Sequence, residues 1–127
     1  MASHSAPRIL AFKADAAIAK GQAVKIGSDN EHVAKCSADT DKAIGVAQSV
    51  ASAAEDVIEV AIPGGGAKGL AQTTIAAGKL VGPHSDAGLK PVDTAGDRFI
   101  GMAMESAVAG DLFDMEVVVG QAYQSES

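Results

Sequence analysis

Apolar and polar positions alternate along the chain in short runs that Gly, Pro, Asp or Ser residues interrupt. In the run VIEVAI, Ile58, Val60 and Ile62 alternate with other positions, as expected of a strand whose successive side chains point to opposite faces. The run MEVVV repeats this pattern with Met115 and Val117. The first half of the chain is therefore predicted to form four strands, at about 17–26, 31–36, 43–50 and 56–62.

The same sequence pattern occurs twice along the chain. AIAKGQAVKIGSD (17–29) aligns with TIAAGKLVGPHSD (74–86), and DKAIGVAQSVASAAED (41–56) aligns with DRFIGMAMESAVAGD (97–111). Gly21 falls on Gly78, and Lys42 falls on Arg98. Identity, strand face and segment order agree, so we predict an internal repeat of about 57 residues, with half-repeats at about 17–63 and 74–120.

The fold class predicted is all-β: a compact β-barrel or β-sandwich built from two similar four-stranded halves. Gly21 and Gly78 are expected where the chain turns into a strand. Gly45 and Gly101 fall inside strands, which indicates either a bulge or a close approach of another backbone. The GGGAKG run (64–69) is expected to be a flexible linker between the halves.

The ends of the chain lie outside the repeat. Residues 1–12 are expected to form a flexible N-terminal arm, residues 13–122 a single β domain, and residues 123–127 a frayed tail. Residues 8–14 alternate weakly and could instead add an edge strand to the domain. The arm is either disordered or becomes ordered on a partner.

The amino-acid composition excludes two classes of binding partner. A chain of 127 residues with a net charge of −6 and only 3% aromatic residues offers little to phosphates or bases, so neither nucleic acid nor an anionic membrane is an expected partner. No apolar run approaches the length of a membrane span, and residues 1–12 lack the order of a secretory signal. We therefore expect a soluble protein made in the cytoplasm.

Candidate chemistry is sparse. Cys36, the single cysteine, is expected to be a half-buried core or strand residue. GGGAKG lacks the spacing of a phosphate-binding loop, and consecutive His84, Ser85 and Asp86 cannot align as a catalytic triad. Residues 84–86 are therefore expected to form a turn.

The remaining titratable groups also favour a protein without an active site. His4, His32 and His84 share no metal-ligand spacing. Two carboxylate groups, one in each half, are expected to lie on a solvated face; they comprise Glu55, Asp56, Glu59, Asp111, Asp114 and Glu116. We predict no enzymatic activity, no cofactor and no metal site.

Three phrases together resemble the small head decoration, or capsid cement, proteins of tailed bacteriophages: AIAKGQAVKIGSD, DKAIGVAQSVASAAEDVIEVAIPGG and DRFIGMAMESAVAGDLFDMEVVVGQ. The similarity covers residues 17–120. It implies a β-tulip barrel, like that of lambda-like decoration proteins, and a homotrimer over the quasi-threefold axes of an expanded phage head. It also implies synthesis in the bacterial host and a position on the outer surface of the virion, where the protein stabilises the head.

The resemblance further implies that the partner is the major capsid protein and that an N-terminal arm contacts it. Arg8 would pair with a carboxylate of the shell, and Ile9 and Leu10 would be buried against it. The residues assigned to this arm are Ser3, His4, Ser5, Ala6, Pro7, Arg8, Ile9 and Leu10. Two alternatives stay open: a β-clip module of the SAF type that binds small ligands or accompanies an enzyme, and an accessory protein of the phage tail.

Overall fold

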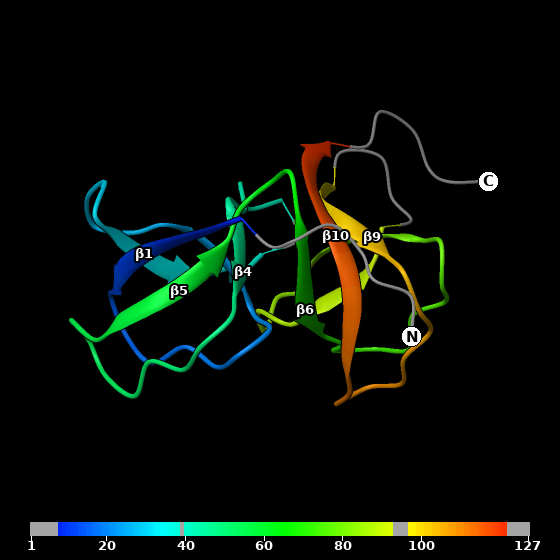
Figure 1. Ribbon diagram of the computed structural model, residues 1–127, viewed down its shortest axis with the longest axis horizontal. Coiled ribbons are helices and arrows are strands. Elements are labelled where there is room, and N and C mark those ends of the chain that lie inside the picture. The colour runs from blue at the N-terminus through cyan, green and yellow to red at the C-terminus, as the bar shows by residue number, and fades with distance from the viewer. Residues whose placement is uncertain (1–7, 39, 93–96, 122–127) are drawn as a thin grey trace.

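The structure, a computed structural model, describes residues 8–38, 40–92 and 97–121. These residues form ten strands and no helix (Figure 1). The strands are β1 (Ile9–Ala14), β2 (Ala23–Ile26), β3 (His32–Lys35), β4 (Gly45–Ala47), β5 (Val57–Ala61), β6 (Gly66–Leu70), β7 (Leu80–Pro83), β8 (Leu89–Pro91), β9 (Arg98–Ala103) and β10 (Leu112–Gln121). The all-β class is confirmed.

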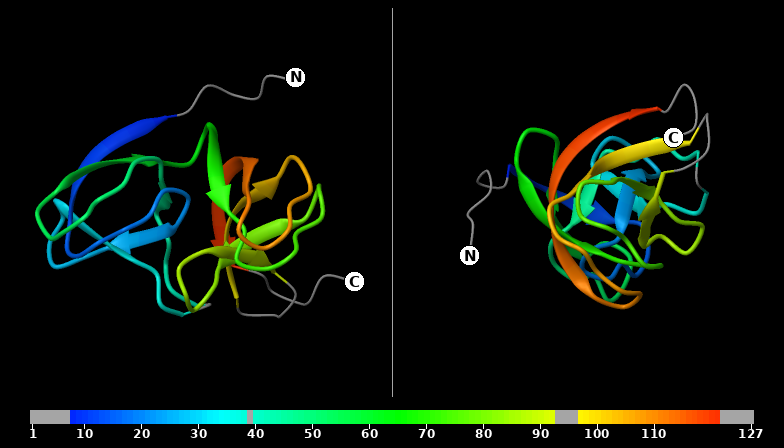
Figure 2. Two further views of the ribbon diagram at one scale, coloured as in Figure 1. Left: turned by 90° about the horizontal axis from the view of Figure 1, so that it is seen from below. Right: turned by 90° about the vertical axis from the view of Figure 1, so that its right-hand side faces the viewer.

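The two halves have the same strand order. In the first half, β1-β3-β2-β4-β5 close into a barrel, in which β1 and β3 pair in parallel and the other neighbours pair antiparallel. In the second half the order is β6-β10-β9-β7-β8, and a parallel bridge between Ala71 and Leu89 links the end of β6 to β8. The halves lie side by side, with the barrel on the left of Figure 1 (Figures 1 and 2). The prediction of two similar halves is confirmed.

Aligned residues make the same backbone contacts in both halves. Ile18 forms an isolated antiparallel bridge with Ala51, and Ile75 forms the equivalent bridge with Ala107. Gly21, at φ 89°, donates its N–H to the Ala47 carbonyl at 2.7 Å. Its aligned counterpart Gly78, at φ 88°, donates to the Ala103 carbonyl at 2.8 Å. A left-handed turn that only glycine adopts readily therefore precedes β2 in the first half and β7 in the second.

Close backbone approach explains the two glycines inside strands. A Cβ on Gly45 would lie 2.3 Å from the carbonyl oxygen of Ala61 in β5. A Cβ on Gly101 would lie 2.4 Å from the carbonyl oxygen of Glu116 in β10. Close approach of a neighbouring backbone therefore accounts for Gly45. At Gly101 both explanations that the sequence allowed apply, because β10 also shifts register between Val117, which pairs with Gly101, and Gly120.

Two hydrophobic clusters hold the fold together. One fills the barrel and includes Ile18, Val24 and Val60. The other unites the second half with the outer surface of the barrel, to which the first half contributes Ala23, Cys36, Val46 and Ala61. In β2, β4 and β5, neighbouring residues are consequently both buried, because one side chain points into the barrel and the next into the shared cluster.

Each half contains five strands, one more than the four predicted: the sequence offered β1 only as an alternative to a flexible arm, and β6 was not anticipated. The boundary placed at residue 12 between arm and domain therefore differs from the structure. Ile9–Ala14 form β1, in which Leu10 pairs with Val60 and Phe12 with Ile58 across an antiparallel ladder. The side chain of Phe12 also packs on the barrel core, which holds this segment in place. Residues 1–7 and 122–127 lie outside the described residues.

The expectation of a flexible linker at 64–69 is wrong in its second part. Gly64 and Gly65 form the connection, where Gly64 adopts φ 109°. From Gly66 onward the chain is strand β6, whose Lys68 pairs with Asp114 of β10. Gly69 is fully enclosed there: a Cβ would lie 2.6 Å from Leu89 Cδ1 and 2.7 Å from Met115 Sδ. Glycine is needed for packing at this position, so its presence did not signal flexibility.

Candidate functional site

Three residues of the expected capsid-binding arm are described, and they lie at the start of β1. The Arg8 carbonyl accepts the N–H of Ile62 at 2.8 Å, and the Arg8 side chain lies over Gly64, whose hypothetical Cβ would be 3.0 Å from Arg8 Cδ. Ile9 and Leu10 are 38% and 49% exposed. These three residues thus form an ordered, partly apolar root; Ser3, His4, Ser5, Ala6 and Pro7 lie outside the described residues.

Apolar side chains continue from this root over one end of the barrel. Leu10 lies on the same side of β1 as Phe12 and Ala14, above the barrel core. Ile62 follows β5 and packs on that core, as Ile44 does, and Ile26 at the end of β2 is 49% exposed. We call this surface the barrel mouth; its residues are Leu10, Phe12, Ile26, Ile44 and Ile62.

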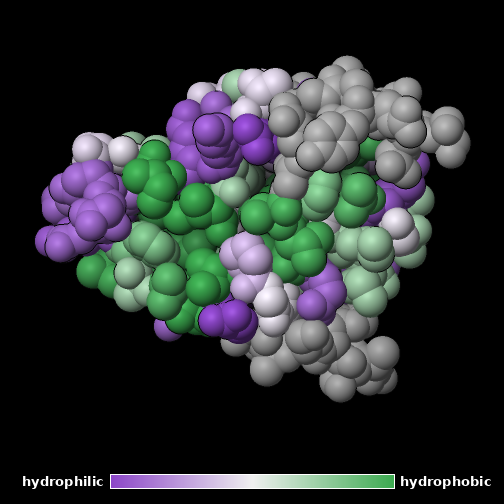
Figure 3. Space-filling model, turned by 90° about the horizontal axis from the view of Figure 1, so that it is seen from above, coloured by the Kyte–Doolittle hydropathy of each residue, from purple (hydrophilic) through white to green (hydrophobic). Residues whose placement is uncertain are grey.

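A cleft of about 200 Å³ opens where the two halves meet. It is lined by two segments that the repeat aligns with each other, together with one residue of β10. We call it the junction cleft, and its residues are Lys42, Ala43, Ile44, Arg98, Phe99 and Val119. Ile44 belongs to both surfaces, so the apolar barrel mouth continues into the cleft. On the molecular surface, apolar side chains gather over the middle of one face and extend across both halves (Figure 3).

Among the described residues, the cations of the junction cleft have no acidic partner, although an aspartate precedes each of them in the sequence. Asp41 is bound to Lys25 Nζ at 3.0 Å, and Asp97 to Lys90 Nζ at 3.4 Å. Across the described segments, neither Lys42 nor Arg98 forms an ion pair, and Arg98 Nε is buried without a hydrogen-bond partner. Both cations thus remain available to an external anion.

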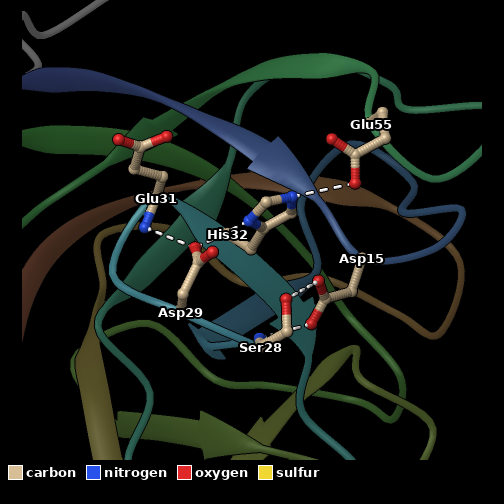
Figure 4. Close-up of polar contacts among 6 residues, drawn as sticks. All are labelled: Asp15, Ser28, Asp29, Glu31, His32 and Glu55. Atoms are coloured by element: carbon tan, nitrogen blue, oxygen red, sulfur yellow. Dashed lines mark hydrogen bonds and ion pairs between the residues drawn. The ribbon is translucent and has the colours of Figure 1, made fainter.

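A polar cluster fastens the β2–β3 turn to the end of β1 and to the bend before β5 (Figure 4). The ring of His32 lies between two carboxylates, with Nδ1 2.7 Å from Asp29 Oδ1 and Nε2 2.9 Å from Glu55 Oε2. Asp15 accepts hydrogen bonds from the backbone N–H and the hydroxyl of Ser28, both at 2.8 Å. Hydrogen bonds that the ring donates to Asp29 and Glu55 raise the pKa of His32, and acceptance of the bond from His32 lowers the pKa of Asp29.

The other candidates have structural roles. Burial raises the pKa of Cys36 to about 12, so its thiol is inert at neutral pH, as expected of a core residue. His84 and Asp86 lie in the turn between β7 and β8, where the Asp86 N–H donates to His84 Nδ1 at 3.0 Å. Within the described ranges, no group of three His, Cys, Asp or Glu side chains could hold a metal ion, and no helix is long and apolar enough to cross a membrane.

Several of the carboxylates expected on a solvated face are structural. Asp56 accepts hydrogen bonds from the N–H groups of Ser52 and Ala53, at 2.9 and 3.2 Å, and so caps the bend before β5. Asp114 forms an ion pair with Lys68 Nζ at 2.6 Å across the β6–β10 ladder. The sequence pattern did not reveal the Lys68–Asp114 pair, because its partners lie far apart along the chain.

Together these features define an all-β protein of two similar five-stranded halves, with an apolar face and a cationic cleft at the junction. No protein-family model matches the chain, and no curated protein matches it. Among solved structures, it is similar to the N base of the head fiber gp8.5 of bacteriophage phi29. The TM-score is 0.69 at 15% sequence identity, and the similarity covers 94% of this chain and 98% of the other. This likeness shows a shared fold over nearly the whole of both chains.

Proposed function

We propose that the protein is a structural component of a phage head, and specifically a decoration protein that binds the outside of the expanded capsid and stabilises it. The observation that carries this proposal is the fold similarity to a phage head fiber base along nearly the full length of both chains. The head decoration phrases in residues 17–120 support the same role independently. In this role the protein is made in the bacterial host, has no enzymatic activity and ends on the virion surface.

The partner in this proposal is the major capsid protein, and the N-terminal segment Ser3–Leu10 is the arm that reaches it. The ordered root of the arm supports this assignment, because Ile9 and Leu10 are half-exposed and offer apolar surface for burial. Arg8 is exposed and can approach a carboxylate of the shell. Three copies would assemble over each quasi-threefold axis, where association buries further apolar side chains such as Val50 and Val57, which are 64% and 65% exposed.

The test mixes the purified protein with expanded, undecorated heads of its own phage and with unexpanded procapsids. Bound copies are counted by sedimentation and gel densitometry. Saturable binding to expanded heads alone, in multiples of three per quasi-threefold site, is the expected result. Binding to neither shell would overturn the proposal and leave the β-clip ligand module to be tested by calorimetry. Labelling confined to the tail would instead identify a tail accessory protein.

A further inference from the structure

The junction cleft combines two features that favour an anionic ligand. Its lining includes two cations, Lys42 and Arg98, on a protein whose net charge is −6. Arg98 Nε is buried and makes no hydrogen bond to any residue that the structure describes, which normally carries a cost of desolvation. The adjacent carboxylates, Asp41 and Asp97, are already bound to Lys25 and Lys90. An external carboxylate would pair with the Arg98 guanidinium, which has no ion-pair partner among the described residues.

The rest of the cleft is apolar, which restricts the class of ligand. Ile44, Phe99 and Val119 line it together with Ala43, and Val119 is 47% exposed. A free phosphate or another small hydrated anion would use the cations and gain nothing from these side chains. A peptide in which a carboxylate neighbours an apolar side chain would engage both. The site therefore matches an acidic peptide segment better than an inorganic anion.

We propose that the junction cleft is the docking site for an acidic, extended segment of the partner protein. A carboxylate of that segment pairs with Arg98 and Lys42, and a neighbouring apolar side chain packs on Ile44, Phe99 and Val119. Charge complementarity selects this occupant, because a cationic cleft attracts an acidic segment even though the protein as a whole is acidic. The identity of the partner as a capsid protein rests on the proposed function.

The position of the cleft agrees with the position of the arm. Gly64, over which the Arg8 side chain lies, donates its N–H to the Val117 carbonyl at 3.1 Å. Val119, two residues further along β10, lines the cleft. The root of the arm and the cleft are thus connected through β10 and through the barrel mouth. A partner reached by the arm would also meet the cleft, so the two contacts reinforce each other as linked binding sites.

The test compares two double variants for binding to expanded heads. Lys42→Gln with Arg98→Gln removes both cations of the cleft, and Lys20→Gln with Lys79→Gln removes the same charge from residues that do not line it. The cleft variant is expected to bind at least tenfold more weakly than wild type, and the control to bind within about twofold. Raising the salt concentration should weaken wild type more than the cleft variant. Equal binding by all three proteins would overturn the proposal.

A second measurement tests the cleft without phage heads and without the double variant Lys42→Gln, Arg98→Gln, which could fail to fold. Amide signals of Ile44 and Phe99 are followed by NMR as acetyl-Leu-Glu-Leu-amide, or its Gln counterpart, is added to the wild-type protein. Saturable shifts with the Glu peptide alone are expected. If the wild-type protein fails to bind heads but shows saturable NMR shifts with the Glu peptide, the proposed capsid role is wrong and the docking site is supported. If inorganic phosphate causes the same shifts as the Glu peptide, or if neither peptide causes any, the peptide site is overturned.

Discussion

At the scale of single residues, the most informative position is Glu55, which adopts φ 73° although it is not glycine. The equivalent bend of the second half has Gly110 at φ 95°, and both N–H groups donate to equivalent carbonyls, those of Ala14 and Ala71. A left-handed glutamate persists only where its surroundings hold it. Here the side chain is held by His32, which ties the bend to the β2–β3 turn.

This cluster predicts a pH-dependent contribution to stability. The pKa of His32 is raised above 6.5, so its charged ring stabilises the fold below that pH, and the stabilisation is lost as the pH rises through the folded-state pKa. The pKa of Asp29 is lowered below 3.8, so its contribution is present above that pH and is lost as the pH falls through the lowered value. The advantage of wild type over His32→Gln should therefore be largest at about pH 4–6.5.

Thermal melting of both proteins from pH 3 to pH 9 measures this advantage. Other charged groups near the ring include Lys13, the register partner of His32, and Glu31, whose backbone N–H binds Asp29 Oδ1. Glu31→Gln is the matched control, because it removes a carboxylate of the same turn that does not bind the ring. A difference in melting temperature between wild type and His32→Gln that stays constant with pH would contradict the assignment.

At the scale of elements, the structure shows that the end of the expected N-terminal arm is a strand of the barrel, β1. β1 pairs with β5 over Ile9–Lys13 but with β3 only at Lys13 and Ala14, so the outer edge of Ile9–Phe12 has no strand partner within the described chain. This segment is at once part of the barrel and part of an open edge. Its weak alternation in the sequence reflects that mixed environment, in which Phe12 is half-buried and Ala11 exposed.

Two truncations separate the arm from the strand. Removal of residues 1–7 leaves β1 intact and is expected to change the free energy of unfolding by less than about 0.5 kcal/mol. Removal of residues 1–12 deletes most of β1 and uncovers the barrel core beneath Phe12, which is expected to cost about 2 kcal/mol or more. Urea denaturation followed by circular dichroism measures both. Equal stability of the two truncated proteins would show that β1 is dispensable to the barrel.

At the scale of the whole molecule, the two halves share a core. Ala23, Val46 and Ala61 of the barrel belong to the same buried cluster as Phe113 and Met115 of the second half. Hydrogen bonds also cross the junction, such as those from the Leu70 N–H to the Gly21 carbonyl at 2.9 Å and from the Ala23 N–H to the Ala87 carbonyl at 2.8 Å. Neither half can unfold without exposing the shared cluster.

The shared core predicts a single cooperative unfolding transition. In calorimetry, the ratio of calorimetric to van't Hoff enthalpy should be close to one. Phe113→Ala in the shared cluster should destabilise the whole molecule by about 3–5 kcal/mol, and Ile58→Ala inside the barrel by about 2–5 kcal/mol. Each variant should shift the same transition. Two resolved transitions, only one of which moves in each variant, would mean that the halves fold independently.

The sequence by itself determined the all-β class, the similarity of the halves and the special glycines. These features follow from local rules, because strand alternation and the steric freedom of Gly21, Gly45, Gly78 and Gly101 are visible in the chain. The resemblance to head decoration proteins implied that residues 3–10 contact the capsid, which stays a prediction.

Only the tertiary structure decided the rest. Strand β6 was mistaken for a linker, because Gly69 is required by packing against Leu89 and Met115, which come from distant strands. The junction cleft could not be predicted either: the alignment matched Lys42 with Arg98, but similarity between two segments does not place them next to each other. Their approach depends on how the halves are docked through the shared cluster, and hence on contacts between residues more than fifty positions apart.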